Sequence, residues 1–120
     1  MHFVWATVTV ADMEESLEFY QKVVGLPLVR RVKSNEFTEL AFLGTSETQI
    51  ELVHRSNAEP QPMGKGISLG FAVEDLEVMI QTVKDLGLEL YEGPIAPNPH
   101  VRFFYVLDPN GLKIQFVERR

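Results

Sequence analysis

Apolar residues recur along most of the chain with the spacing of strands or helices, and the same order of elements occurs twice. Residues 3–10 alternate between apolar and polar, as in a half-buried strand. Asp12 follows with Glu15 three residues later, a pattern typical of a helix N-terminus, and Gly25 is placed to end that helix. Further strands are predicted over 26–32, 36–43 and 48–55. The first half is therefore predicted to fold as βαβββ.

The second half repeats this order of elements. Residues 67–73 form the next predicted strand, Asp75 is the predicted N-cap of a second helix, and Gly87 ends that helix. The strands predicted after it cover 88–92, 101–107 and 112–118. Residues 93–100 contain three prolines, at positions 94, 97 and 99, which predicts a stiff irregular loop at a strand edge.

The repeat extends to individual positions. The two helices match at an offset of 63 residues, as Asp12 and Asp75 illustrate, and the segment QIELVHR matches KIQFVER at an offset of 64. Two copies are too few for a solenoid, so the halves are expected to complete one compact domain or to pair with a second chain. We predict one α+β domain over 1–120, with modules at 1–55 and 67–120 joined by a linker at 56–66.

Charge and composition narrow the possible partners. The net charge is −6, which argues against a nucleic-acid or anionic-membrane partner. The chain has no cysteine, so it can form no disulfide and carry out no thiolate chemistry. Its start lacks the pattern of a signal peptide, and a cytoplasmic protein is expected. Arg30, Arg31 and Lys33 form the only local basic cluster, which indicates a solvated loop.

The last predicted strand of each module indicates a candidate site. Ile50 and Leu52 alternate with Glu51, and the aliphatic pair is expected to pack on the helix, which leaves Glu51 on the opposite face. The repeat gives Gln115 the equivalent position. Convergent polar residues at inward positions are typical of a ligand cavity. The residues expected on this concave face are Trp5, Thr7, Glu51, Ser68 and Gln115.

Several candidates have a structural alternative. Glu51 could be a general base or a ligand contact, or a carboxylate hydrogen-bonded within the protein. Trp5 could be a stacking platform or a core aromatic residue. His100 is a candidate ligand contact or proton shuttle on a loop, whereas His54 has the opposite parity to Glu51 and His2 belongs to the terminus. In the first module, the apolar wall of the cavity is expected to be formed by Leu40 and Phe42, or else by Ala41 and Leu43.

The whole chain resembles the vicinal oxygen chelate superfamily, which includes glyoxalase I, the bleomycin-resistance proteins and the extradiol dioxygenases. The segments that carry the resemblance are VADMEESLEFYQKVVGLPL, AFLG followed by QIELVHR, GISLGFAVEDLE, and FFYVLDPNGLKIQFVE. The resemblance implies paired βαβββ modules that form a cup-shaped mixed sheet with helices on the outer face. It also implies a homodimer with strands of both chains lining each site, and it favours Phe103 and Tyr105 as inward-facing residues.

In the metal-dependent members, four side chains that are typically histidine and glutamate occupy positions that here hold Trp5, Glu51, Ser68 and Gln115. Only Glu51 is a usual ligand, because indole has no lone pair for a metal and a serine hydroxyl is a poor ligand. We therefore predict no tightly bound metal. The alternative is a divalent ion such as Ni, Zn or Fe, held weakly through Glu51 and Gln115.

These observations predict a protein that binds a small organic molecule in the cup. The alternative is a lyase or isomerase resembling lactoylglutathione lyase, with Glu51 as the catalytic proton carrier, so the sequence leaves open whether the protein is an enzyme. A dimer used only for protein contacts is a third possibility. The residues predicted to bind the ligand are Trp5, Thr7, Glu51, Ser68, His100, Phe103, Tyr105 and Gln115.

Overall fold

Each half of the chain forms a four-stranded sheet with one helical segment, as the repeat predicts. The computed structural model describes residues 1–120, in two units that cover Met1–Pro62 (unit 1) and Met63–Arg120 (unit 2). The boundary between the units falls within the segment 56–66 that the composition marks as a linker. The α+β class and the two βαβββ modules are confirmed.

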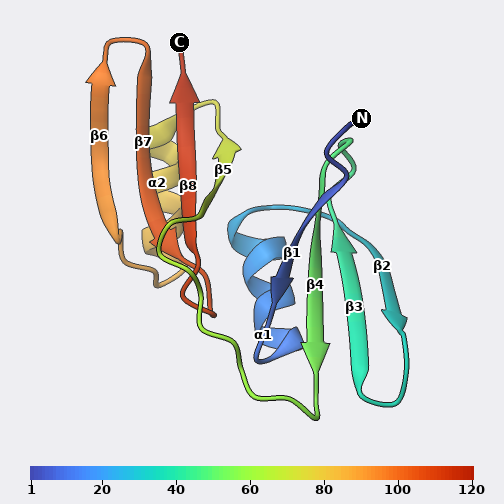
Figure 1. Ribbon diagram of the computed structural model, residues 1–120. Helices are drawn as coiled ribbons and strands as arrows, with labels where there is room; N and C mark the ends of the chain where they lie inside the picture. Colours follow the sequence, from blue (N-terminus) through green and yellow to red (C-terminus); the bar gives the residue numbers. More distant parts are fainter. The chain divides into compact units, whose positions relative to one another are not determined.

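In unit 1 the strand order across the sheet is β1-β4-β3-β2, with β1 parallel to β4 and the other pairs antiparallel (Figure 1). Its elements are β1 (Trp5–Thr9), α1 (Met13–Glu18), the π-helix η1 (Phe19–Val23), β2 (Leu28–Lys33), β3 (Thr38–Leu43) and β4 (Gln49–Arg55).

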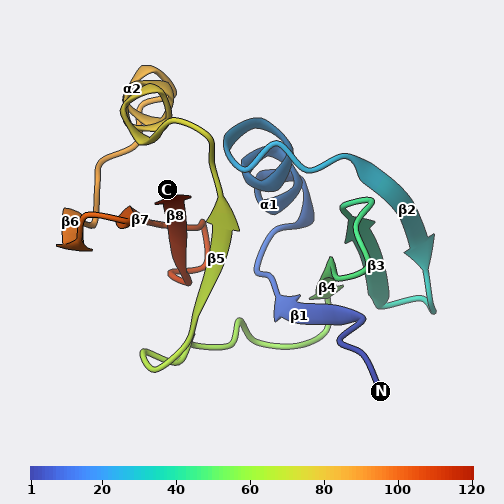
Figure 2. The ribbon, with the colours of Figure 1, turned by 90° about the horizontal axis from the view of Figure 1, so that it is seen from above.

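Unit 2 has the equivalent order, β5-β8-β7-β6, with β5 parallel to β8. Its elements are β5 (Ser68–Ala72), α2 (Leu76–Asp85), β6 (Glu92–Asn98), β7 (Val101–Leu107) and β8 (Lys113–Arg119). In each unit the helix covers one face of its own sheet (Figure 2).

The core of each unit lies between that helix and the sheet. Leu52 of β4 is fully buried in unit 1, and Ile114 and Phe116 of β8 are buried in unit 2. Burial of one such side chain contributes about 1.5–3 kcal/mol of folding free energy. The parity predicted for the last strand of each module is therefore confirmed.

Both predicted helix N-caps are confirmed. The Asp12 carboxylate accepts a hydrogen bond from the Glu15 amide at 3.0 Å, and Asp75 accepts one from the Val78 amide at 3.2 Å. The prediction of a single continuous first helix is wrong, because the residues after Glu18 form a π-helix rather than a further α-helical turn. The wider π-helical turn buries Val23, whereas an uninterrupted α-helical spacing of Met13, Leu17 and Tyr20 would have buried Val24, which is only half-buried.

The prediction for 88–100 is also wrong. The strand lies at Glu92–Asn98, so that only Glu92 belongs to the predicted strand 88–92 and the other six residues belong to the predicted loop, and 88–91 are not part of a strand. β6 is the outermost strand of its sheet and pairs only with β7, at irregular register. A central strand uses its backbone N–H groups to bond strands on both sides, and proline has no N–H to donate. An edge strand bonds a strand on one side only and therefore tolerates proline. The prolines therefore mark the edge of the sheet rather than a loop.

The start of α2 is tied to β8 by a buried carboxylate. Glu118 accepts a hydrogen bond from the amide of Leu76, the first residue of the helix, at 2.7 Å, and is itself buried. Arg120 donates a second hydrogen bond to the same side chain. The Leu76 amide first, and then Arg120, lower the pKa of Glu118 below its ordinary value.

Replacing Glu118 by glutamine is expected to lower the unfolding temperature at pH 7. A carboxylate with a lowered pKa stabilises the fold above its unfolded-state pKa of about 4.3, and this contribution is lost as the pH falls through the lower folded-state value. The difference between wild type and Glu118→Gln should therefore disappear in acid, as thermal unfolding at pH 7 and below pH 4 would show. Glu77→Gln is the matched control, because Glu77 lies at the same helix end but is exposed and pairs with Arg102. An equal effect of both variants at pH 7 would contradict the prediction.

Candidate functional site

The predicted site residues of unit 1 lie together on the sheet face opposite α1. Thr7 on β1 and Glu51 on β4 are register partners, and the Thr7 hydroxyl donates a hydrogen bond to Oε1 of Glu51 at 2.6 Å. This contact fixes the carboxylate through one oxygen and leaves Oε2 without a hydrogen bond inside the chain. A half-buried carboxylate held in this way can accept a hydrogen bond from a ligand.

An aromatic pair lies beside that carboxylate. Trp5 packs edge-on against Phe42, with ring centroids 5.5 Å apart and planes at 65°, yet the tryptophan remains 45% exposed. Phe42 is a register partner of Glu51 and is itself buried. This decides between the two alternatives for the cavity wall in favour of Leu40 and Phe42. Ala41 and Leu43 are fully buried and alternate with Phe42 along β3, so they lie on the helix side. Phe42 therefore supports the exposed ring of Trp5 on the same face of the sheet as Glu51.

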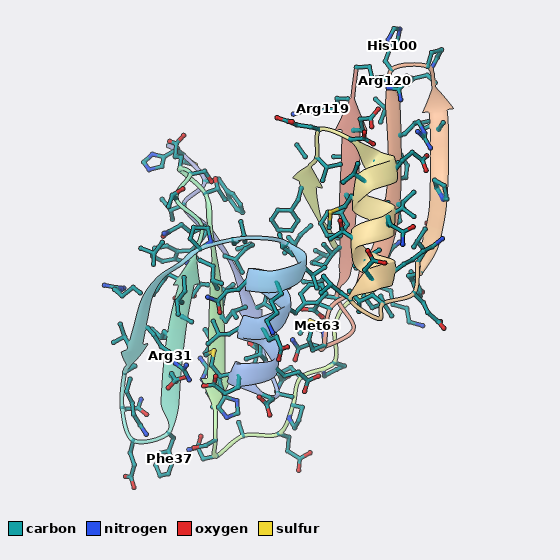
Figure 3. All side chains as sticks on the ribbon, turned by 180° about the vertical axis from the view of Figure 1, so that it is seen from behind. Arg31, Phe37, Met63, His100, Arg119 and Arg120 are labelled. Carbon is teal, nitrogen blue, oxygen red and sulfur yellow. The ribbon has the colours of Figure 1, made fainter.

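Arg30 is a site residue that the sequence analysis missed. Residues 30, 31 and 33 lie on β2 rather than in a loop, and the predicted solvated cluster is divided between the two faces of the strand. The Arg30 guanidinium lies over the ring of Phe42, with Cζ 4.7 Å from the centroid. Arg31 instead bonds Glu14 and Glu39, which raise its pKa above the ordinary value (Figure 3). The alternation within 30–33, beyond the register irregularity between Leu28 and Arg30, is the signal that could have separated the two arginines.

Unit 2 carries a second group of polar and aromatic residues on the face opposite α2. Gln115 donates a hydrogen bond through Nε2 to the Tyr105 hydroxyl at 3.3 Å, and the rings of Phe103 and Tyr105 are 5.7 Å apart. The predicted parity of these aromatic residues is confirmed, because Phe104 of the same strand is fully buried. Lys113, which the sequence analysis missed, places its ammonium 4.3 Å from the centroid of the Tyr105 ring.

Gly70 occupies the position in unit 2 that Thr7 occupies in unit 1. It is the register partner of Gln115, just as Thr7 is the partner of Glu51. A Cβ added at Gly70 would lie 3.0 Å from Oε1 of Gln115. The glycine thus gives the amide side chain room to reach Tyr105, and the two repeats hold their polar residue in different ways.

Of the other candidates, Ser68 borders the unit 2 group, and His100 and His54 lie apart from both groups. Ser68 is exposed at the start of β5, beside Lys113 in register. His100 lies at the tip of the β6–β7 turn (Figure 3). It is five residues before Tyr105 along the strand, which corresponds to about 17 Å. His54 bonds the carbonyl oxygen of Val10 through Nδ1 and lines a hollow of about 300 Å³ on the helix side of its sheet, away from Glu51.

The residues at the four symmetric positions do not fit a transition metal. Trp5 and Glu51 in unit 1 offer one carboxylate, whereas Ser68 and Gln115 in unit 2 offer a hydroxyl and an amide that is bonded to Tyr105. Zinc, nickel and iron sites need several imidazole, thiolate or carboxylate ligands. In neither unit do three or more histidine, aspartate or glutamate side chains come close enough to hold an ion.

Comparison with known proteins decides the family. The family model described as Glyoxalase/Bleomycin resistance protein/Dioxygenase superfamily matches residues 2–116. The chain belongs to this superfamily. Among curated members, a lactoylglutathione lyase of Neisseria meningitidis is 33% identical over 129 residues, with 100% of this chain and 92% of that protein aligned. The uncharacterized protein YwbC of Bacillus subtilis is 30% identical, with 93% of each chain aligned.

Two solved structures share the fold of this chain. A glyoxalase I mutant from Zea mays matches with a TM-score of 0.87 at 22% identity, over 98% of this chain and 45% of that one. TnmS3, an antibiotic binding protein from Streptomyces sp. CB03234, matches with a TM-score of 0.79 at 20% identity, over 100% and 97% of the two chains. None of the helices here is both long enough and apolar enough to span a bilayer.

Proposed function

We propose that this superfamily member binds a small, partly apolar organic molecule without a tightly bound metal. The observation that carries the proposal is the Glu51 carboxylate, which Thr7 orients at 2.6 Å and which lies on the same face as the exposed ring of Trp5. Such a face offers apolar area for stacking and a charged acceptor for orientation. In unit 2, Gln115, Tyr105 and Phe103 offer the same combination with a neutral polar group.

Two further points support binding over metal-dependent chemistry. Trp5, Ser68 and Gln115 stand where a metal site would need ligands of another type. The fold is also shared with TnmS3, an antibiotic binding protein, so it is compatible with the binding of an organic molecule. Ser68 and His100 remain in the proposed ligand set as contacts from the strand start and the turn. A homodimer in the cytoplasm remains a prediction.

The second candidate is a lyase or isomerase of the lactoylglutathione lyase type. The 33% identity to the Neisseria protein over the whole chain favours it, as does the free oxygen of Glu51. In this function Glu51 takes a proton from one carbon of the substrate and returns it to the neighbouring carbon. The proton transfer requires the carboxylate, whereas binding alone tolerates its loss with reduced affinity.

A thermal-stabilisation screen tests the first function. A library of small organic compounds of all charge types is expected to contain compounds that raise the unfolding temperature of the wild type. Glu51→Ala should weaken binding of these compounds by about tenfold, the usual loss for a hydrogen bond to a charged group. Glu59→Ala, an exposed carboxylate elsewhere in unit 1, is the control and should leave binding unchanged.

A parallel assay separates the two functions. Turnover of the glutathione–methylglyoxal hemithioacetal that is abolished by Glu51→Ala would establish the lyase. Absence of both turnover and stabilising compounds would contradict the proposal that Glu51 and Trp5 form a ligand site.

A further inference from the structure

One residue from each strand of unit 1 contributes to a straight row across the face opposite α1. Arg30 on β2 is the register partner of Phe42 on β3, Phe42 is the partner of Glu51 on β4, and Glu51 is the partner of Thr7 on β1. Directly paired residues project from the same face of a sheet. Neighbouring strands are about 4.8 Å apart, so the backbones of Arg30 and Glu51 are about 10 Å apart, with the aromatic ring between them.

The two charged residues of this row have opposite signs and do not neutralise each other. Arg30 contacts the face of Phe42, and no ion pair joins it to a carboxylate. A guanidinium has five N–H donors, and contact with a ring face leaves them free to meet an anion. Two strands away, Glu51 has one oxygen bonded to Thr7 and one available as an acceptor.

Of Arg30 and Arg31, only Arg30, which lies on the face of Glu51, lacks an ion pair. Arg31 is one residue further along β2, on the helix side, where it forms ion pairs with Glu14 and Glu39. Its Nε and Nη2 therefore bond carboxylates within the chain. Arg30 has no such partners, although the chain as a whole is acidic with a net charge of −6.

Given the proposed function, on which this inference rests, we infer the class of ligand that unit 1 selects. It is a planar conjugated acid that also carries a hydrogen-bond donor at its far end. The ring lies on the exposed face of Trp5, the acid group meets the guanidinium of Arg30 over Phe42, and the donor meets the free oxygen of Glu51. The backbones of Arg30 and Glu51 are about 10 Å apart, which leaves room between the two side chains for a ligand of one or two fused rings with polar groups at opposite ends.

A series of three related compounds tests the inference. The probe 6-hydroxy-2-naphthoate has both polar groups, 2-naphthoate lacks the donor, and 6-hydroxy-2-naphthamide lacks the charge. Isothermal titration calorimetry of the wild type is expected to show the first compound bound about tenfold more tightly than either of the others.

Variants assign each difference to a residue. Arg30→Gln should remove the preference for the acid over the amide, and Glu51→Ala should remove the preference for the hydroxy compound over plain naphthoate. Arg31→Gln is the matched control, because it removes the same charge from the other face and should leave all three affinities unchanged.

Failure of this inference is distinguishable from failure of the proposed function. Equal binding of the acid and the amide, an unchanged preference in Arg30→Gln, or no binding of any probe would overturn the ligand class. Stabilising compounds that depend on Trp5 and Glu51 in the broad screen would still support the binding function. If the screen finds no such compound, the proposed function itself is wrong.

Discussion

Replacing Trp5 by alanine is expected to weaken binding of the stabilising organic compounds by about 30-fold. A tryptophan that anchors a ligand typically contributes about 2 kcal/mol, because its ring offers a large apolar area at little cost in conformational entropy. In unit 1 the indole already packs against Phe42, so the platform is held in place before the ligand arrives. Calorimetric titration of wild type and variant with the same compound measures the change.

Two variants show whether the loss is specific. Trp5→Phe should retain a large part of the affinity, because a smaller aromatic face remains. Phe37→Ala should leave affinity unchanged, since Phe37 is also 45% exposed but lies at the turn between β2 and β3 (Figure 3). Equal losses in Trp5→Ala and Phe37→Ala would mean that exposed aromatic area, rather than the site, determines binding.

Replacing Gly93 by alanine is expected to lower the free energy of unfolding by about 3 kcal/mol. Gly93 has φ of +97°, which side chains rarely adopt, and an added Cβ would lie 3.0 Å from the carbonyl oxygen of Phe103. It would also lie 3.1 Å from the Cα of Phe104. Both contacts are with the backbone or core of β7, which cannot move aside as a flexible side chain can.

Gly87→Ala is the control for this prediction. Gly87 has a similar φ of +82° but no atom within 4 Å of the added Cβ, so only the conformational strain remains, about 1 kcal/mol. Urea unfolding of wild type and both variants at pH 7 gives the three free energies. Equal destabilisation by the two variants would show that the close approach of Gly93 to β7 has no energetic consequence.

The sequence predicted those parts of the fold that depend on local pattern. Caps at Asp12 and Asp75 and the alternation around Glu51 were readable, because they follow from hydrogen bonding and strand geometry within a few residues. The position of β6 was not readable. Most of the proline-rich segment 93–100 forms a strand only because it lies at the edge of the sheet, and its place in the sheet depends on pairing with β7.

The sequence predicted which face of each strand carries the candidate site, but it did not predict all of the residues in the site. Glu51 and Trp5 were found because the duplicated pattern marks their faces, and the parity of Phe103 and Tyr105 came from the family resemblance. Arg30 and Lys113 were missed because each acts through an aromatic residue on a neighbouring strand. Strand register decides such contacts, and the spacing within one strand does not reveal it.

The central claim is that the site holds an organic molecule through aromatic and polar side chains and does not depend on a tightly bound metal. The most direct test is the metal content of the wild type beside Glu51→Ala after exposure to trace nickel, zinc, manganese and iron and removal of free ions. The claim predicts far less than one metal ion per chain in both proteins. Close to one ion per chain in the wild type, lost in Glu51→Ala, would contradict it.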